Sequence, residues 1–232
     1  MTGIAANLKE VRALVDATIR QSDRRRGEVS LVAVSKTFPS DAIREVHAAG
    51  QAEFGENYLQ EAVEKITSLS DLSLTWHFIG PIQSNKTAQI AQLFQWAHAV
   101  DRVKIAQRLA AQRPAHLPPL NICIQVNVSG EESKSGVAPD ELPQLVEAIA
   151  PLEGISLRGL MCIPEPTPDE QLLRRRFRHL ATLRDQLNEA FGLTMDTLSM
   201  GMSADMVTAI QEGATLVRVG SAIFGGRTNK SQ

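Results

Sequence analysis

The sequence has little of what marks a secreted, membrane-spanning or nucleic-acid-binding protein. Its two cysteines, Cys123 and Cys162, lie in apolar segments without CxxC spacing, which indicates core residues in a reducing compartment and no disulfide framework. No apolar run approaches the roughly 20 residues that span a bilayer, and the start lacks a signal-peptide pattern. A net charge of −2 indicates no nucleic-acid partner and no membrane surface. We therefore expect a soluble, cytoplasmic protein.

Histidines and tyrosines are also scarce. The five histidines are scattered and show no metal-ligand spacing, so we expect no metal site. The basic run at 174–179 falls on a helix with an apolar stripe, which indicates a solvated helix face and not a nucleic-acid contact. Tyr58, the only tyrosine, comes just after the second expected strand.

The sequence does have a regular alternation of short apolar runs and amphipathic segments, which is typical of an α/β fold. Eight such pairs in 232 residues predict a single (β/α)8 TIM-type barrel, and an open doubly wound sheet is the alternative. We expect one domain over 1–232, with an extra N-terminal helix within 1–30 and the barrel over 31–226. The strand-like runs are 31–35, 52–55, 75–79, 96–100, 120–126, 155–162, 196–199 and 215–219.

Lys36 ends the first of these runs. The break that follows, Thr37–Asp41, places Lys36 where a strand meets a loop, and barrels bind ligands at the carboxyl ends of their strands. An amine that is partly buried there loses hydration, and its neutral form can attack an aldehyde to give a Schiff base. The alternative is a lysine whose stem packs against the protein while its head reaches water.

Two loops that contain glycine and serine follow the seventh and eighth runs. Gly201 permits close backbone approach, and Ser203 is expected to cap a helix whose free N–H groups suit an anion. Gly220 and Ser221 repeat this arrangement. Barrels often bind phosphate in this region, although turns and caps alone would use the same residues.

A lysine that forms a Schiff base and a phosphate site together predict pyridoxal 5′-phosphate (PLP), which carries both an aldehyde and a phosphate. Arg218 ends the eighth run and is the candidate partner for the pyridine nitrogen. An arginine donates a hydrogen bond without giving up its proton, so the ring would stay neutral and stabilise carbanions poorly. The alternative for Arg218 is a salt bridge within the barrel.

Seven motifs, spread from about Leu31 to Gly226, resemble those of the pyridoxal phosphate homeostasis proteins. The resemblance implies a barrel like the N-terminal domain of alanine racemase, with PLP on Lys36, phosphate near the late loops and the ring nitrogen facing Arg218. A conservative departure is Phe38, where the family often carries histidine. The motifs are AVSKT (33–37), FGENY (54–58), WHFIGPIQSNK (76–86), SKSG (133–136), GLM (159–161), LSMGMS (198–203) and VRVGSAIFG (217–225).

The resemblance also implies a role in intracellular PLP homeostasis without an established catalytic activity. The expected cofactor-binding residues are Lys36, Asn57, Ser199, Gly201, Ser203, Arg218, Gly220 and Ser221. PLP-dependent apo-enzymes are the candidate recipients of the cofactor, and we expect a monomer, because the sequence ends without the second domain through which alanine racemases dimerise.

An amino-acid racemase-like enzyme is the main alternative function. A two-base racemase needs a second acid or base opposite the lysine, and in alanine racemases a tyrosine outside the barrel supplies it. The sequence ends at Gln232 and its only tyrosine belongs to the barrel, so we expect no enzyme. A lysine-dependent aldolase would need an acid–base pair near Lys36 that the sequence does not reveal.

Two further polar segments belong near the expected site. Gln83–Lys86 follows the third run, where it could receive a carboxylate or a partner protein, or could simply begin a helix. Lys134, in the polar loop 129–136, could form a transient second Schiff base as PLP leaves.

Overall fold

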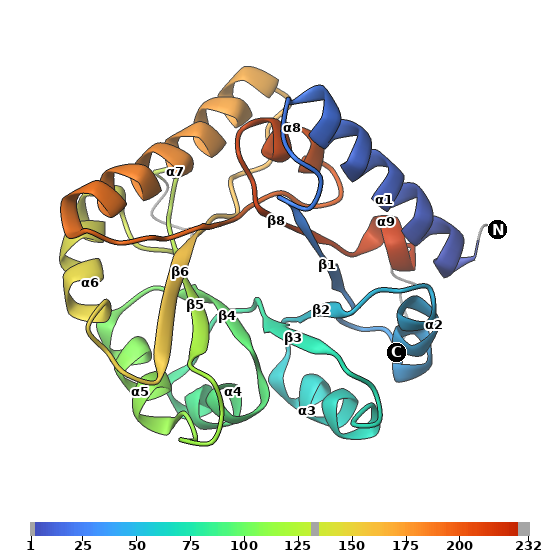
Figure 1. Cartoon of the computed structure of the whole chain (residues 1–232), viewed down its shortest axis with the longest axis horizontal. Helices are drawn as coiled ribbons and strands as arrows, with labels where there is room; N and C mark the ends of the chain where they lie inside the picture. The colour runs from blue at the N-terminus through green and yellow to red at the C-terminus, as the bar shows by residue number, and fades with distance from the viewer. Residues whose placement is uncertain (1–2, 131–134, 227–232) are drawn as a thin grey trace.

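The chain folds as a closed barrel of parallel strands. The computed structural model describes residues 3–130 and 135–226. The strands pair in sequence order, and the last pairs with the first, so the barrel is confirmed and the open sheet is wrong. Helices surround the strands on the outside (Figure 1). The strands are β1 (Ser30–Val34), β2 (Glu53–Glu56), β3 (Thr75–Phe78), β4 (Trp96–Val100), β5 (Leu120–Gln125), β6 (Ile155–Met161), β7 (Thr197–Ser199) and β8 (Leu216–Val219).

The helices lie close to the expected positions. None of those in the described residues is both long and apolar enough to cross a membrane. The α-helices are α1 (Ile4–Gln21), α2 (Ser40–Ala48), α3 (Leu59–Ser68), α4 (Thr87–Leu93), α5 (Val103–Gln112), α6 (Leu142–Ile149), α7 (Glu170–Phe191), α8 (Met206–Gln211) and α9 (Ser221–Phe224); short 3-10 turns at Ser84–Lys86 and Pro139–Glu141 precede α4 and α6.

Helix α1 is the extra N-terminal helix. Its apolar face, with Leu8, Val11, Val15 and Ile19 at helical spacing, is buried. The helix packs across α8 and α9, as Figure 1 shows at the outer edge of the molecule. It therefore covers the outside of the barrel where the last strand returns to the first.

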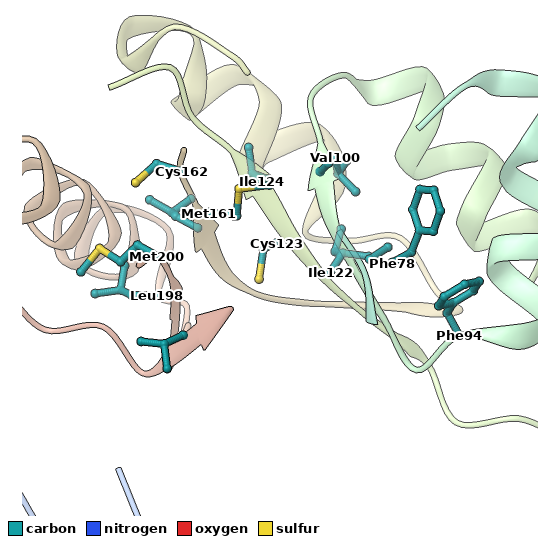
Figure 2. Close-up of a cluster of buried hydrophobic side chains, with 14 of the residues drawn as sticks. Phe78, Phe94, Val100, Ile122, Cys123, Ile124, Met161, Cys162, Leu198 and Met200 are labelled. Atoms are coloured by element: carbon teal, nitrogen blue, oxygen red, sulfur yellow. The ribbon is translucent and has the colours of Figure 1, made fainter. Parts of the chain in front are cut away.

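The apolar core fills the layer between the strands and the helices (Figure 2). Phe78 of β3 meets Phe94, just after α4, in an edge-on contact with ring centroids 5.3 Å apart. Cys123 and Cys162 are fully buried, as expected of core residues, and burial raises the pKa of each thiol to about 12.

The pairing of β6 with β5 contains a shift in register. The pairing of Ile122 with Leu157 is followed by that of Cys123 with Gly159, so Arg158 is an extra residue in the ladder. A Cβ atom at Gly159 would lie 1.8 Å from the carbonyl oxygen of Thr197 on β7. The backbones of β6 and β7 can approach this closely only because residue 159 has no side chain.

Candidate cofactor site

A pocket of about 340 Å³ opens at the carboxyl ends of the strands. Two larger cavities, about 440 Å³ each, share Ser30 and Glu53 at the opposite end of the barrel. We assign the site to the smaller pocket, because barrels bind ligands at the carboxyl ends of their strands and because Lys36 lies there. The lining residues are Val34, Lys36, Phe38, Asn57, Ile79, Ile163, Met202, Ser203, Ala204, Arg218, Gly220, Ser221 and Gly225.

The structure brings most of the expected site residues to this pocket. Those that line it are Lys36, Asn57, Ser203, Arg218, Gly220 and Ser221. Ser199 and Gly201 do not line it; both lie behind the pocket, where the Ser199 hydroxyl and the Gly201 carbonyl accept hydrogen bonds from Arg218. These two residues therefore contact the pocket through Arg218.

The two late loops meet, but the helix expected after Ser203 starts differently. Asp205 is the N-terminal cap of α8 and accepts a hydrogen bond from the Met202 amide at 2.6 Å, so the prediction that Ser203 caps this helix is wrong. The Ser203 hydroxyl instead accepts from the Ala222 amide, 3.3 Å away in α9. This contact links the loop after β7 to the loop after β8 and gathers their polar groups on one side of the pocket.

Arg218 is buried, and neutral acceptors hold its guanidinium. Its guanidinium donates to Ser199 Oγ at 2.6 Å and to the Cys162 carbonyl at 3.0 Å. Among the described residues no carboxylate forms an ion pair with it, so the alternative of a salt bridge within the barrel does not hold there. Burial lowers the pKa of this guanidinium from its usual value. A cation held by neutral acceptors keeps its charge available to a ligand in the pocket.

A chain of hydrogen bonds continues from Arg218 into the barrel interior. Ser199 Oγ lies 2.8 Å from His98 Nδ1, and His98 Nε2 lies 3.0 Å from His77 Nδ1. The arrangement that satisfies the most groups has Ser199 accepting from Arg218 and donating to His98, and His98 donating to His77. His77 then stacks on Trp96, with ring centroids 5.6 Å apart. Sequence reasoning set both histidines aside because they fit no metal spacing.

Both histidines are expected to make the fold sensitive to acid. Burial lowers the pKa of His77 to about 3 and that of His98 well below its ordinary value, whereas in the unfolded chain each takes up a proton near pH 6.5. The unfolded state therefore binds more protons as the pH falls from 6.5, and each histidine lowers the free energy of unfolding by about 1.4 kcal/mol per pH unit.

Urea unfolding at several pH values between about 6.5 and 5 measures this effect. In a His98→Gln variant, the change in the free energy of unfolding with pH should be smaller than in the wild type by about 1.4 kcal/mol per pH unit. The His116→Gln variant, changed at an exposed histidine, is the matched control for the loss of an imidazole. An unchanged slope in His98→Gln would show that the imidazole at 98 is not held neutral.

The other pocket walls are apolar or supply single polar atoms. Phe38, at a position where the family often carries histidine, stacks on Phe224 with ring centroids 5.1 Å apart. It gives the pocket an aromatic wall. Asn57 Oδ1 is buried and finds no hydrogen-bond partner among the described residues.

Other candidates lie apart from the pocket or beyond the described residues. Tyr58 is 52% exposed and does not line the pocket. Gln83–Lys86 forms the turn into α4 and also stays outside the pocket lining. Lys134 falls outside the described residues. Within 3–130 and 135–226 no group of three or more histidine, cysteine or acidic side chains could hold a metal ion.

The sequence is similar to proteins named pyridoxal phosphate homeostasis protein. It is 57% identical to the one from Pseudomonas aeruginosa over 98% of this chain and 97% of that protein. The Escherichia coli protein of the same name is 48% identical over 98% of each chain. The family model for the alanine racemase N-terminal domain matches residues 4–228.

The structure is also similar to solved structures of PipY and of an alanine racemase. PipY from Synechococcus elongatus, solved with PLP bound, superposes with a TM-score of 0.80 at 35% identity, covering 91% of this chain and all of that one. An alanine racemase from Clostridium difficile is 14% identical with a TM-score of 0.75; the match covers 97% of this chain and 58% of the racemase, and it shows a shared fold. The chain therefore belongs to the pyridoxal phosphate homeostasis proteins, a family built on the alanine racemase N-terminal barrel.

Proposed function

We propose that this protein binds PLP as a Schiff base on Lys36 and serves in intracellular PLP homeostasis without turning over a substrate. The observation that carries the proposal is the composition of one pocket. An amine, a buried guanidinium and two joined loops that contain serine and glycine line the same 340 Å³ space. The names of close relatives and the PLP bound to PipY support the same ligand.

The residues present fit PLP group by group. Lys36 can bond the aldehyde carbon, and Ser203, Gly220 and Ser221 offer hydroxyl and backbone donors to a phosphate. Asn57 Oδ1 is a buried acceptor without a partner, which a ligand hydroxyl can satisfy. Phe38 and its neighbours supply apolar surface for a flat ring.

Lys36 performs the covalent step in this proposal. Its neutral amine forms a carbon–nitrogen double bond with the aldehyde carbon, and the aldehyde oxygen leaves as water together with the two amine protons. Loss of a proton from the ammonium must come first, because only the neutral amine is a nucleophile. PLP, when bound, supplies an electron sink, and its strength depends on the partner of the ring nitrogen.

Arg218 and Tyr58 favour binding over turnover. Arg218 donates without transferring a proton, so a ring nitrogen that faces it stays neutral and withdraws electrons weakly. Tyr58 is exposed outside the pocket, so it does not supply the second acid or base that a two-base racemase needs. We further propose that the chain acts as one barrel domain and as a cytoplasmic monomer, with PLP-dependent apo-enzymes as recipients.

Borohydride trapping tests the proposed function. The full chain is incubated with PLP, its visible absorption spectrum is recorded, and the reduced protein is digested and mapped by mass spectrometry. We expect an absorption band of a Schiff base and a reduced adduct on Lys36. A protein that stays colourless and unmodified would overturn the proposal.

A further inference from the structure

The residue that follows Lys36 adopts an unfavourable backbone conformation. Thr37 has φ = 70°, in the left-handed region that a β-branched residue rarely adopts. Such conformations persist only where the surrounding structure holds them, and they gather at functional sites. The contacts that hold Ser35 and Thr37, on either side of Lys36, come from two neighbouring elements.

A cluster of charged side chains from β2 and α3 binds this segment. The Thr37 amide donates to Glu61 Oε1 at 2.6 Å, and the Ser35 carbonyl accepts from Lys65 Nζ at 2.7 Å. The Ser35 hydroxyl donates to Glu56 Oε1 at 2.6 Å. The residues flanking Lys36 are thus held through one backbone donor, one backbone acceptor and one hydroxyl.

Lys65 is the centre of this cluster. Its ammonium donates to the Ser35 carbonyl, Glu56 and Glu61, which uses all three of its N–H groups. The side chains of Lys65 and Glu56 are 6% and 0% exposed, so both charges are paired out of contact with water. Breaking such a buried pair is costly, which makes the cluster a rigid support.

The cluster lies outside the pocket. None of Glu56, Glu61 and Lys65 is among the lining residues, so they act on a ligand only through the backbone that carries Lys36. The sequence itself points to this cluster. Lys65 lies on the same buried face of α3 as Leu59 and Ala62, where an apolar residue is expected.

We propose that Glu61 and Lys65 are positioning residues that hold the backbone on both sides of Lys36, with Thr37 in its strained conformation, and so aim the Lys36 amine into the pocket. This inference rests on the proposed function of Lys36. If Glu61 positions this backbone, the rate of Schiff-base formation depends on one hydrogen bond, which the Thr37 amide donates to Glu61.

The test compares Glu61→Ala with Glu64→Ala. Both changes remove a glutamate from α3, but Glu64 is exposed and lies outside the cluster, so it controls for the loss of charge and for helix propensity. In the full-length apoprotein we expect the Thr37 amide to exchange with solvent deuterium at least about tenfold faster in Glu61→Ala. We expect Schiff-base formation with PLP, followed by stopped flow, to slow by about 10- to 100-fold, because misplacement by about 1 Å costs up to this much.

Glu61→Gln should rescue both measurements, because an amide oxygen at the same place accepts from Thr37. A merely structural effect on α3 would appear in Glu64→Ala as well. Faster exchange of Thr37 with an unchanged rate of Schiff-base formation would overturn the positioning role and leave the proposed function intact. A wild-type protein that forms no adduct on Lys36 would overturn both, and the exchange data would then report on the backbone alone.

Discussion

Replacing Lys36 by alanine is expected to abolish the covalent PLP adduct and to give a protein that loses its cofactor on gel filtration. In the proposed site the amine of Lys36 bonds to the aldehyde, and without it the pocket residues Ser203, Gly220 and Arg218 would offer PLP only non-covalent contacts. We expect affinity for PLP to fall by about 100-fold or more, which corresponds to roughly 3 kcal/mol. Equilibrium titration followed by absorbance measures this change, and borohydride reduction with mass mapping measures the adduct.

Lys104→Ala is the matched control, because Lys104 is an exposed lysine on α5 away from the pocket. This variant should form the adduct as the wild type does. A Lys36→Ala protein that still traps one PLP per chain after reduction, on any other lysine, would contradict the assignment. Mapping the same variant also tests whether Lys134 accepts PLP, since no adduct at Lys134 would count against a second Schiff base there.

Replacing Gly159 by alanine is expected to destabilise the barrel by at least about 3 kcal/mol, at the upper end of what an overpacked core costs. The added Cβ would lie 1.8 Å from the Thr197 carbonyl oxygen, and this neighbour is backbone within a strand, so it has little freedom to move. Relief requires β6 and β7 to separate, which breaks their ladder. The expected fall in Tm is about 6–12 °C, measured by calorimetry or circular dichroism.

Gly226→Ala is the control for the loss of a glycine, because an added Cβ there meets no atom of the described residues within 4 Å. It should shift Tm by no more than a degree or two, as a surface change does (about 0.5 kcal/mol). A Gly159→Ala protein with the wild-type Tm would mean that β6 and β7 can separate without cost at this point.

The sequence predicts the barrel well because periodicity along a chain reports local structure. Each of the eight strands falls within or beside its expected apolar run, and Leu8 to Ile19 mark the buried face of α1. The closure of the sheet could not be derived in this way, because pairing of β8 with β1 joins residues almost 190 positions apart. The number of strand–helix pairs and the length of the chain favoured a closed barrel over an open sheet, and the resemblance to a known family implied the same fold.

Sequence reasoning found pocket residues whose chemistry lies on a single side chain, and it missed features that depend on a contact between distant segments. Lys36 and Arg218 stand out because a charged side chain follows the apolar strand β1 and another lies within the apolar strand β8. His98 and Ser199 are 101 positions apart, and nothing in either segment shows that they bond across the barrel. Ser203 lines the pocket, but it does not cap α8, because the helix begins only at Met206 and its N-cap residue is Asp205, two residues after Ser203.

The two buried cysteines, Cys123 and Cys162, make opening of the barrel measurable. With a pKa of about 12, each thiol is ionised to roughly one part in 100,000 at neutral pH, and neither competes with an amine for an aldehyde. They are the only cysteines in the chain, and both are inaccessible while the barrel is closed. The rate at which a thiol reagent labels this protein therefore reports how often the barrel opens, and it does so without any added probe.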